Sequence, residues 1–256
     1  MADAVARIRS ERSGDLARVV IDNPGRANAL GSALLEALRA TFESFAADPP
    51  RAVVLTGAGD RAFAGGADLA ELGALDVNSG RRFITKVHEA CDAVRRCPAP
   101  VIARVRGYAL GAGLELAASC DIRVASEDAM FGMPEVRFGI PSVVEAALLP
   151  RMLGRGRAAW FLLTGRNIDA RTALDWGLVE RVVPAEALDA EVNATLAAIG
   201  EMDPQAVREQ KRLLAFWDER PLSEGIAESI EALAQSYRDG VPNRLIEGFF
   251  AARKRR

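Results

Sequence analysis

Two glutamates, Glu115 and Glu135, are the side chains of this sequence best suited to acid–base chemistry. Glu115 closes a glycine-rich run that begins at Gly107, and Glu135 closes the short run 131–135. The chain has one histidine, so few other side chains exchange protons near neutral pH. Two carboxylates beside a glycine-rich turn can divide the roles of acid and base if their surroundings separate their pKa values. The pair therefore predicts proton-transfer chemistry, provided that the two side chains meet in space.

The other polar candidates have simpler interpretations. His88 falls in the middle of an expected helix beside Glu89, which favours a packed or solvated histidine over a catalytic one. Glu145 follows Glu135 by ten residues, and the sequence alone assigns it no role. Glu115 lies among leucines and alanines, where a carboxylate risks burial and becomes costly unless it is paired or protonated.

Two stretches of small residues could supply backbone donors to a ligand. The first, Ala62 to Leu69, contains Gly65 and Gly66, which allow close approach to the main chain. The second, Gly111 to Gly113, opens an expected helix, where free N–H groups suit developing negative charge. Each stretch could equally be an ordinary turn. Neither contains a dinucleotide fingerprint or a phosphate-binding loop.

The composition sets limits on the class of protein. Half of the 256 residues are hydrophobic, which is enough for a large core. A net charge of −2 and a pI near 5.7 argue against nucleic-acid binding. We expect no membrane segment, because no apolar run is long enough. The three cysteines lack metal-ligand spacing, so we expect no metal site, reduced thiols and a cytoplasmic location.

Short strand-like runs alternate with helical ones through the first two thirds of the chain. We expect strands at 16–22, 52–56, 101–105 and 122–125, and helices at 33–46 with Ser32 as N-cap, 80–96 and 114–119. Such alternation predicts an α/β fold with a largely parallel sheet. Helices at 188–199, 205–216 and 222–237 then follow without a strand. We therefore expect an α/β core over 1–184 and a helical C-terminal region over 185–256.

Taken in order, these runs resemble the enoyl-CoA hydratase/isomerase (crotonase) family. The resemblance covers nearly the whole chain and rests on five stretches: 23–30 (NP…NAL), 62–69 (AFxAGxD), 107–115 (GxxxGxGxE), 163–184 (LTG…A…GLV…VVP) and 247–254 (EG…K). It implies a crotonase-like spiral of ββα units, a helical C-terminal trimerisation region, and a homotrimer or dimer of trimers. It also implies an acyl-CoA thioester as substrate, with no cofactor beyond the coenzyme A of that substrate.

The resemblance also assigns roles to individual residues. The backbone N–H groups of Ala67 and Ala112 would form the oxyanion hole, and Glu115 and Glu135 fall on the positions of the hydratase pair. In that chemistry the two carboxylates hold one water, which adds across the Cα=Cβ bond of a 2-enoyl thioester. The implied substrate and coenzyme A contacts are Arg26, Ala27, Ala64, Gly66, Ala67, Asp68, Leu69, Gly111, Phe249 and Lys254.

The sequence departs from the family pattern at Gly65, at Ala112 and, most seriously, at residues 139–145, and two other functions stay open. Residues 139–145 replace the glycine-rich run that hydratases usually carry, and this part of the chain shapes the acyl pocket. A Δ3-Δ2 enoyl-CoA isomerase would share the fold and the enolate stabilisation. A non-catalytic scaffold that binds coenzyme A or RNA is the third reading, against which the acidic pI and the intact glutamate pair argue.

Overall fold

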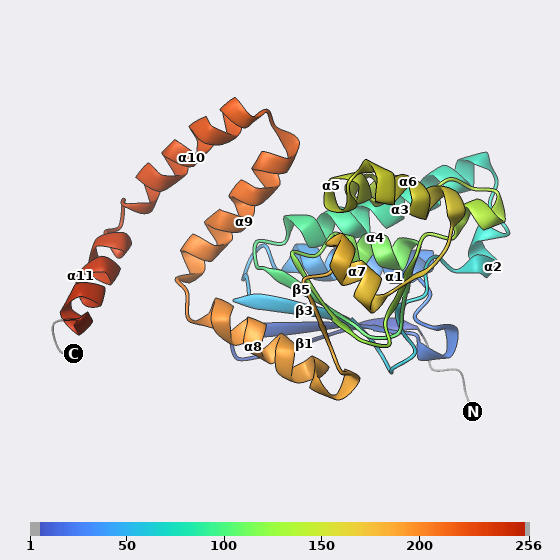
Figure 1. The fold of residues 1–256 in the computed structure, drawn as a ribbon, viewed down its shortest axis with the longest axis horizontal. Helices are drawn as coiled ribbons and strands as arrows, with labels where there is room; N and C mark the ends of the chain where they lie inside the picture. The colour runs from blue at the N-terminus through green and yellow to red at the C-terminus, as the bar shows by residue number, and fades with distance from the viewer. Residues whose placement is uncertain (1–5, 254–256) are drawn as a thin grey trace. The chain divides into compact units, whose positions relative to one another are not determined.

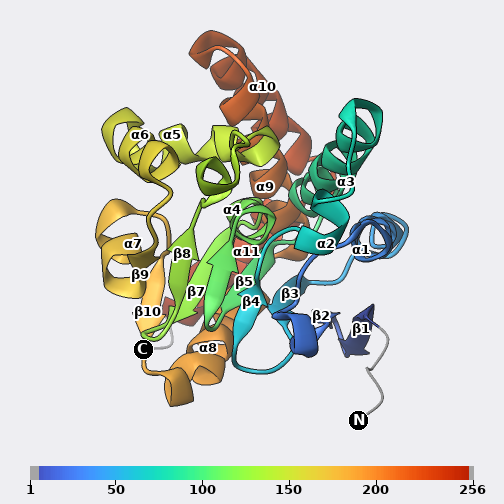
Figure 2. The same cartoon turned by 90° about the vertical axis from the view of Figure 1, so that its right-hand side faces the viewer.

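The computed structural model describes residues 6–253, and the chain divides into two compact units, with the boundary between residues 201 and 202. The first unit is built on a six-stranded sheet (Figures 1 and 2). Its strands are, in spatial order, β1 (Arg7–Ser13), β2 (Leu16–Asp22), β3 (Ala52–Gly57), β5 (Val101–Val105), β7 (Ile122–Ser126) and β10 (Arg181–Val183). Only β1 pairs antiparallel with its neighbour, so the prediction of an α/β fold with a largely parallel sheet is confirmed.

A second, smaller sheet carries the segments of interest for function. It orders the short strands β4 (Ala62–Ala64), β6 (Tyr108–Leu110), β8 (Met130–Gly132) and β9 (Ile168–Asp169), the last of which is antiparallel. Each of these strands has only two or three residues, which is too short for alternation to be visible in the sequence. Pairing of β4 with β6 brings the two glycine-containing stretches side by side.

Helices pack on both faces of the six-stranded sheet. The first unit contains α1 (Ser32–Ser44), α2 (Leu69–Leu72), α3 (Val77–Arg96), α4 (Ala112–Ala118), α5 (Leu149–Leu153), α6 (Arg155–Thr164), α7 (Ala170–Trp176) and α8 (Leu188–Gly200). It also contains the 3-10 turns η1 (Pro24–Arg26), η2 (Glu135–Phe138), η3 (Val144–Leu148) and η4 (Ala185–Ala187). Alternate residues of β3 point to opposite faces: Val53 and Leu55 join the core formed with α1, α3 and α4, whereas Ala52 and Val54 pack with α8.

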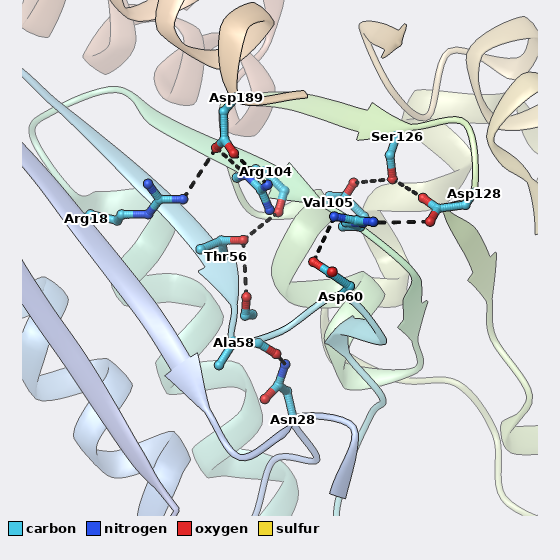
Figure 3. A network of polar contacts seen from close by, with 12 residues as sticks. Arg18, Asn28, Thr56, Ala58, Asp60, Arg104, Val105, Ser126, Asp128 and Asp189 are labelled. Atoms are coloured by element: carbon cyan, nitrogen blue, oxygen red, sulfur yellow. Dashed lines mark hydrogen bonds and ion pairs between the residues drawn. The ribbon is translucent and has the colours of Figure 1, made fainter. Parts of the chain in front are cut away.

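Helix α8 belongs to the first unit, beyond the boundary after residue 184 that the sequence suggested. Its Leu188, Val192 and Leu196 are buried against the sheet. Asp189 also accepts two hydrogen bonds from Arg104 of β5, at 2.7 and 3.0 Å (Figure 3). Because both apolar packing and a bidentate ion pair attach α8 to the strands, the unit continues to Glu201.

The start of α1 differs from the expectation. The predicted N-cap at Ser32 is wrong, because Gly31 is the N-cap and Ser32 is the first helical residue. Glu71 of α2 accepts a hydrogen bond from the Ser32 N–H at 2.8 Å and also binds the Ser32 hydroxyl. A carboxylate from a helix distant in sequence thus caps the N-terminus of α1 in place of a local side chain.

The second unit consists of α9 (Pro204–Glu219), α10 (Leu222–Ser236) and α11 (Val241–Arg253), coloured orange to red in Figure 1. Helices α9 and α10 contact each other, and the indole N–H of Trp217 donates to the carbonyl of Gly225 at 3.2 Å. Many large apolar side chains of this unit are exposed, among them Leu222, Ile230, Leu233, Leu245, Phe249 and Phe250. Within residues 6–253, no helix has both the length and the apolar character that crossing a bilayer requires.

Candidate active site

A cavity of about 530 Å³ in the first unit brings the predicted chemical groups together. Glu115, Glu135, Ala67 and Ala112 all line it. The rest of its wall is mostly apolar and comes from α2, α3, the second sheet and the segment after Glu135: Leu69, Leu72, Leu75, Phe83, Ile84, Val87, Leu110, Pro134, Phe138, Ile140, Pro141 and Val143, with Arg137 and Asn167 as polar members. A mostly apolar pocket with a few convergent polar groups is typical of a small-molecule site.

The first turn, residues 65–68, is held in place by the segment that precedes α1. The Gly65 N–H donates to the carbonyl of Ala27 at 2.8 Å. On either side of Ala67, the carbonyl of Gly66 accepts from the Leu30 N–H, and the Asp68 N–H donates to the carbonyl of Leu30. Asn28 is fully buried in a left-handed conformation with φ of 56°. Its side-chain amide donates to the carbonyls of Ala58 and Ala62 at 3.0 and 2.7 Å (the first of these in Figure 3), which fixes the strand leading into the turn.

The second turn, at Gly111, faces the first. Gly66 and Gly111 have backbone φ values of 103° and 49°, which residues other than glycine rarely adopt. A Cβ atom placed on Gly111 would lie 4.0 Å from the Gly66 Cα, so the two turns approach closely. The Gly111 N–H is engaged with the carbonyl of Gly132 at 2.9 Å, and its carbonyl accepts from Glu115 N–H at 3.0 Å.

Two of the unengaged N–H donors of these turns belong to Ala67 and Ala112. Their neighbours Asp68 and Gly111 donate to backbone carbonyls, but no acceptor within residues 6–253 is paired with the N–H of Ala67 or of Ala112. Both residues line the cavity. Two preorganised donors at one pocket are suited to stabilise an oxygen that gains negative charge during a reaction.

Glu115 is a buried carboxyl group with a strongly perturbed pKa. It lies on α4 with 5 % of its surface exposed, and its Oε1 accepts a hydrogen bond from the Ala146 N–H at 3.0 Å. Burial raises its pKa to about 8; the hydrogen bond from Ala146 opposes this, and the charges of Glu135 and Glu145 add to it. Glu115 therefore carries a proton at pH 7 in the free site.

Glu135 begins η2 and lies on the same cavity, partly exposed. Its Oε2 accepts a hydrogen bond from the Ser142 hydroxyl at 2.8 Å. Its Oε1 would be only 2.5 Å from a Cβ atom on Gly111, the residue that opens the helix of Glu115. The structure thus brings the two glutamates to one site, as the chemistry inferred from the sequence requires.

The implied substrate contacts divide into three groups. Gly66, Ala67, Leu69 and Gly111 line the cavity. Arg26, Ala27, Ala64 and Asp68 lie outside its lining: Arg26 forms an ion pair with Asp68 at 2.5 Å, Ala27 accepts the Gly65 N–H, and Ala64 is fully buried in β4. Phe249 lies exposed on α11 of the second unit, and Lys254 lies outside the described residues. The role of all three groups in binding the substrate or its coenzyme A stays a prediction.

Several residues that shape the site were missed by the sequence reasoning. Ser142 and Ala146 hold the two catalytic candidates, and Asn28 holds the first turn. A hydroxyl near Glu135 could have been suspected from sequence, but a backbone donor such as Ala146 leaves no signal. His88 and Glu145, set aside or unassigned at first, form a pair at 2.8 Å between Nδ1 and Oε1.

Comparison with known proteins gives a consistent family assignment. Residues 11–239 match the family model described as enoyl-CoA hydratase/isomerase. The short-chain-enoyl-CoA hydratase of Clostridium acetobutylicum is 34% identical over 250 residues, which cover 93% of this chain and 96% of that protein. An enoyl-CoA hydratase structure from Mycobacterium smegmatis superposes with a TM-score of 0.92 at 32% identity, covering 96% of both chains.

A third relative is described by two activities. The structure of an enoyl-CoA hydratase/carnithine racemase from Magnetospirillum magneticum has a TM-score of 0.86 at 37% identity, covering 97% of this chain and 93% of that one. The chain belongs to the enoyl-CoA hydratase/isomerase family and has the crotonase fold. The fold inferred from the resemblance is therefore confirmed.

Proposed function

We propose that this protein is an enoyl-CoA hydratase, which adds water across the Cα=Cβ bond of a 2-enoyl-CoA thioester to give a 3-hydroxyacyl-CoA. The observation that carries the proposal is the convergence of two carboxyl groups and two unengaged N–H donors on one apolar cavity. The apolar wall suits a hydrocarbon acyl chain, and the family and the named relatives support an acyl-CoA substrate.

The proposed reaction uses each group once. The thioester oxygen accepts hydrogen bonds from the N–H groups of Ala67 and Ala112, and Glu115 takes a proton from the water held between the carboxyl groups. The water oxygen bonds to Cβ while the π electrons of the double bond move onto Cα and the thioester oxygen. Glu135 then delivers its proton to Cα, and the enolate collapses to the thioester. Each oxyanion donor is worth about 3–4 kcal/mol in comparable acyl chemistry.

The proton inventory of the pair fits this reaction. Hydration needs one proton shared by the two carboxyl groups, and the raised pKa of Glu115 keeps a proton in the pair at pH 7. The proton begins on Glu135 in the proposed step and ends on Glu115. Burial favours the second arrangement in the free site, so the next hydration requires the proton to pass back to Glu135 through an incoming water.

Substitution of each glutamate tests the proposal. Glu115→Gln and Glu135→Gln should each lower the hydration rate by about 10²–10⁴-fold, the range of acid–base contributions, while acyl-CoA still binds. Glu186→Gln, at an exposed residue of η4, is the matched control and should retain full activity. Near-normal hydration by either active-site variant would refute the assignment.

The main rival is a Δ3-Δ2 enoyl-CoA isomerase, in which a glutamate moves a proton between Cα and Cγ. Adding a 2-enoyl-CoA to the wild-type protein separates the two functions. A hydratase removes the absorbance of the conjugated thioester and forms a 3-hydroxyacyl product. With a 3-enoyl-CoA as the starting substrate, an isomerase instead forms the conjugated 2-enoyl-CoA without taking up water. A protein that turns over neither substrate but binds coenzyme A or RNA would support the scaffold reading.

We further propose that the protein is a homotrimer, or a dimer of trimers, assembled through the second unit. The support is the number of large apolar side chains that α10 and α11 leave exposed, including Leu222, Ile230, Leu233, Leu245 and Phe249. Analytical ultracentrifugation gives the mass directly, and a monomer at micromolar concentration would refute the proposed trimer.

The proposed reaction needs no cofactor beyond the coenzyme A of the substrate. A cytoplasmic location would suit the three buried cysteines, which form no disulfide.

A further inference from the structure

Residues 142–146 form a short segment that contacts both catalytic candidates. At its start, the Ser142 hydroxyl donates to Glu135 Oε2 at 2.8 Å. At its end, the Ala146 N–H donates to Glu115 Oε1 at 3.0 Å. Because each carboxyl group receives a hydrogen bond from this 142–146 segment, a displacement of the segment would misorient both groups together.

The backbone of the 142–146 segment is strained at its centre. Val144 has φ of 43°, in the left-handed region that a β-branched residue rarely adopts. Such a conformation persists only where the surrounding contacts hold it. The neighbouring Val143 lines the catalytic cavity, so the strain lies immediately beside the site.

Glu145 provides a contact that could hold this conformation. Its side chain is buried, with 4 % of the residue exposed, and Oε1 lies 2.8 Å from Nδ1 of His88 on α3. Its other oxygen, Oε2, is also buried and has no hydrogen-bond partner in the described part of the chain. Burial raises the pKa of Glu145, while the hydrogen bond and charge of His88 lower it, so His88 favours the charged form that pairs with it.

The groups around this pair come from the two helices that flank the site. Asp92 and Arg95 of α3 act on Glu145 with opposite signs, and Glu145 in turn raises the pKa of Glu115 on α4. Burial, followed by the charges of Glu145 and Glu115, raises the pKa of the Cys91 thiol. Glu145 is therefore buried beside Cys91 and Glu115, whereas the His88 ring that pairs with it is half exposed.

We propose that His88 and Glu145 are positioning residues of the active site. Their contact attaches the 142–146 segment to α3 and thereby holds Ser142 and Ala146 where they orient Glu135 and Glu115. Neither His88 nor Glu145 touches the reacting atoms. The inference rests on the proposed hydratase function for its activity readout, but the attachment of the segment is testable without activity.

The test compares His88→Ala, Glu145→Ala and the double variant with Lys86→Gln. Lys86 lies on the same helix and forms an ion pair with Glu36 of α1 at 2.7 Å, so its variant breaks a contact of α3 that is remote from the 142–146 segment. We expect kcat to fall 10–100-fold in both alanine variants with KM changed less than threefold. The double variant should be no slower than the slower single variant, because all three variants lose the same His88–Glu145 contact.

Two further measurements separate positioning from general loss of structure. Glu145→Gln keeps an oxygen that accepts the His88 N–H, so it should retain at least a third of the wild-type kcat. Amide hydrogen exchange, followed by mass spectrometry on peptides covering 142–148, should be faster in His88→Ala and unchanged in Lys86→Gln. If an alanine variant fails to fold, His88→Leu and Glu145→Leu carry the same comparison, since both fill the space of the original side chain and remove the hydrogen bond.

The outcomes that overturn the inference are specific. Wild-type kcat in His88→Ala, equal losses in Lys86→Gln, or multiplying losses in the double variant would each remove the positioning role. So would a Glu145→Gln variant as slow as Glu145→Ala, or unchanged exchange of peptides 142–148. By contrast, if the wild-type protein hydrates no 2-enoyl-CoA, the proposed function fails while the exchange experiment still tests the attachment.

Discussion

Replacing Glu115 by Gln should stabilise the folded protein while lowering the hydration rate by about 10²–10⁴-fold, and the gain in stability should depend on pH. Gln at this position keeps an oxygen to accept the Ala146 N–H and removes the ionisable group. Below the ordinary pKa of 4.5 the carboxyl group is protonated in both the folded and the unfolded chain, so its ionisation does not lower the free energy of unfolding. Between 4.5 and about 8 the unfolded chain ionises while burial keeps the proton on the folded one, so wild-type stability is lost as the pH rises.

The size of the effect follows from the two pKa values. Each unit of difference corresponds to about 1.4 kcal/mol, so moving from 4.5 to about 8 gives a full penalty of about 5 kcal/mol above pH 8. At pH 5 less than about 1 kcal/mol of this penalty has developed. The advantage of Glu115→Gln over wild type should therefore grow by about 3–4 kcal/mol between pH 5 and pH 8.

Urea unfolding of both proteins at pH 5 and pH 8 measures this growth, at one protein concentration so that any oligomer affects both equally. Exposed Glu186→Gln is the control and should follow wild type at both pH values. The reasoning is refuted if the difference in unfolding free energy between Glu115→Gln and wild type changes by less than about 1 kcal/mol between the two pH values.

Three further predictions concern activity. The kcat/KM for hydration should fall above about pH 8, because loss of the shared proton from Glu115 leaves the pair without an acid; a profile still rising at pH 9 would contradict this. Gly111→Ala should lower kcat by at least about 100-fold, since its Cβ would lie 2.5 Å from Glu135 Oε1. Gly156→Ala, whose added Cβ would have no atom within 4 Å, is the control variant in the same steady-state kinetic assay. Ser142→Ala should reduce kcat by about tenfold through loss of one hydrogen bond to a carboxylate, and an unchanged kcat would exclude that role.

The sequence predicted the larger elements because their signals are local. Strands β3 and β5 are continuous apolar runs between turn residues, and both were expected within a residue of their observed bounds. The second sheet was missed because β4, β6 and β8 have three residues each and exist only by pairing with one another. Strand β1 was also missed, since its alternation of charged residues resembles a solvated loop.

The candidate site was predictable to the extent that it uses side chains and glycines near one another in sequence. Both glutamates and both glycine-containing turns were identified, and all of them line the cavity. What could not be predicted depends on long-range contacts. The hydrogen bond from Ala146 to Glu115 spans 31 positions, and the contact of His88 with Glu145 spans 57. Nothing in local spacing indicates that η3 returns to pack beside α3 and α4.

The burial of Glu115 connects stability with the proposed chemistry. In water its carboxyl group would ionise near pH 4.5, and a fully ionised pair would have no proton for Cα. Burial of this carboxyl group on α4 raises its pKa and so retains that proton, at a cost to folding stability. The free site then rests with the proton on Glu115, which is the arrangement that dehydration of a 3-hydroxyacyl-CoA uses first. Hydration begins from the other arrangement, so its rate includes the proton shift between the two carboxyl groups. The same buried environment that destabilises the folded protein therefore makes the pair competent in both directions.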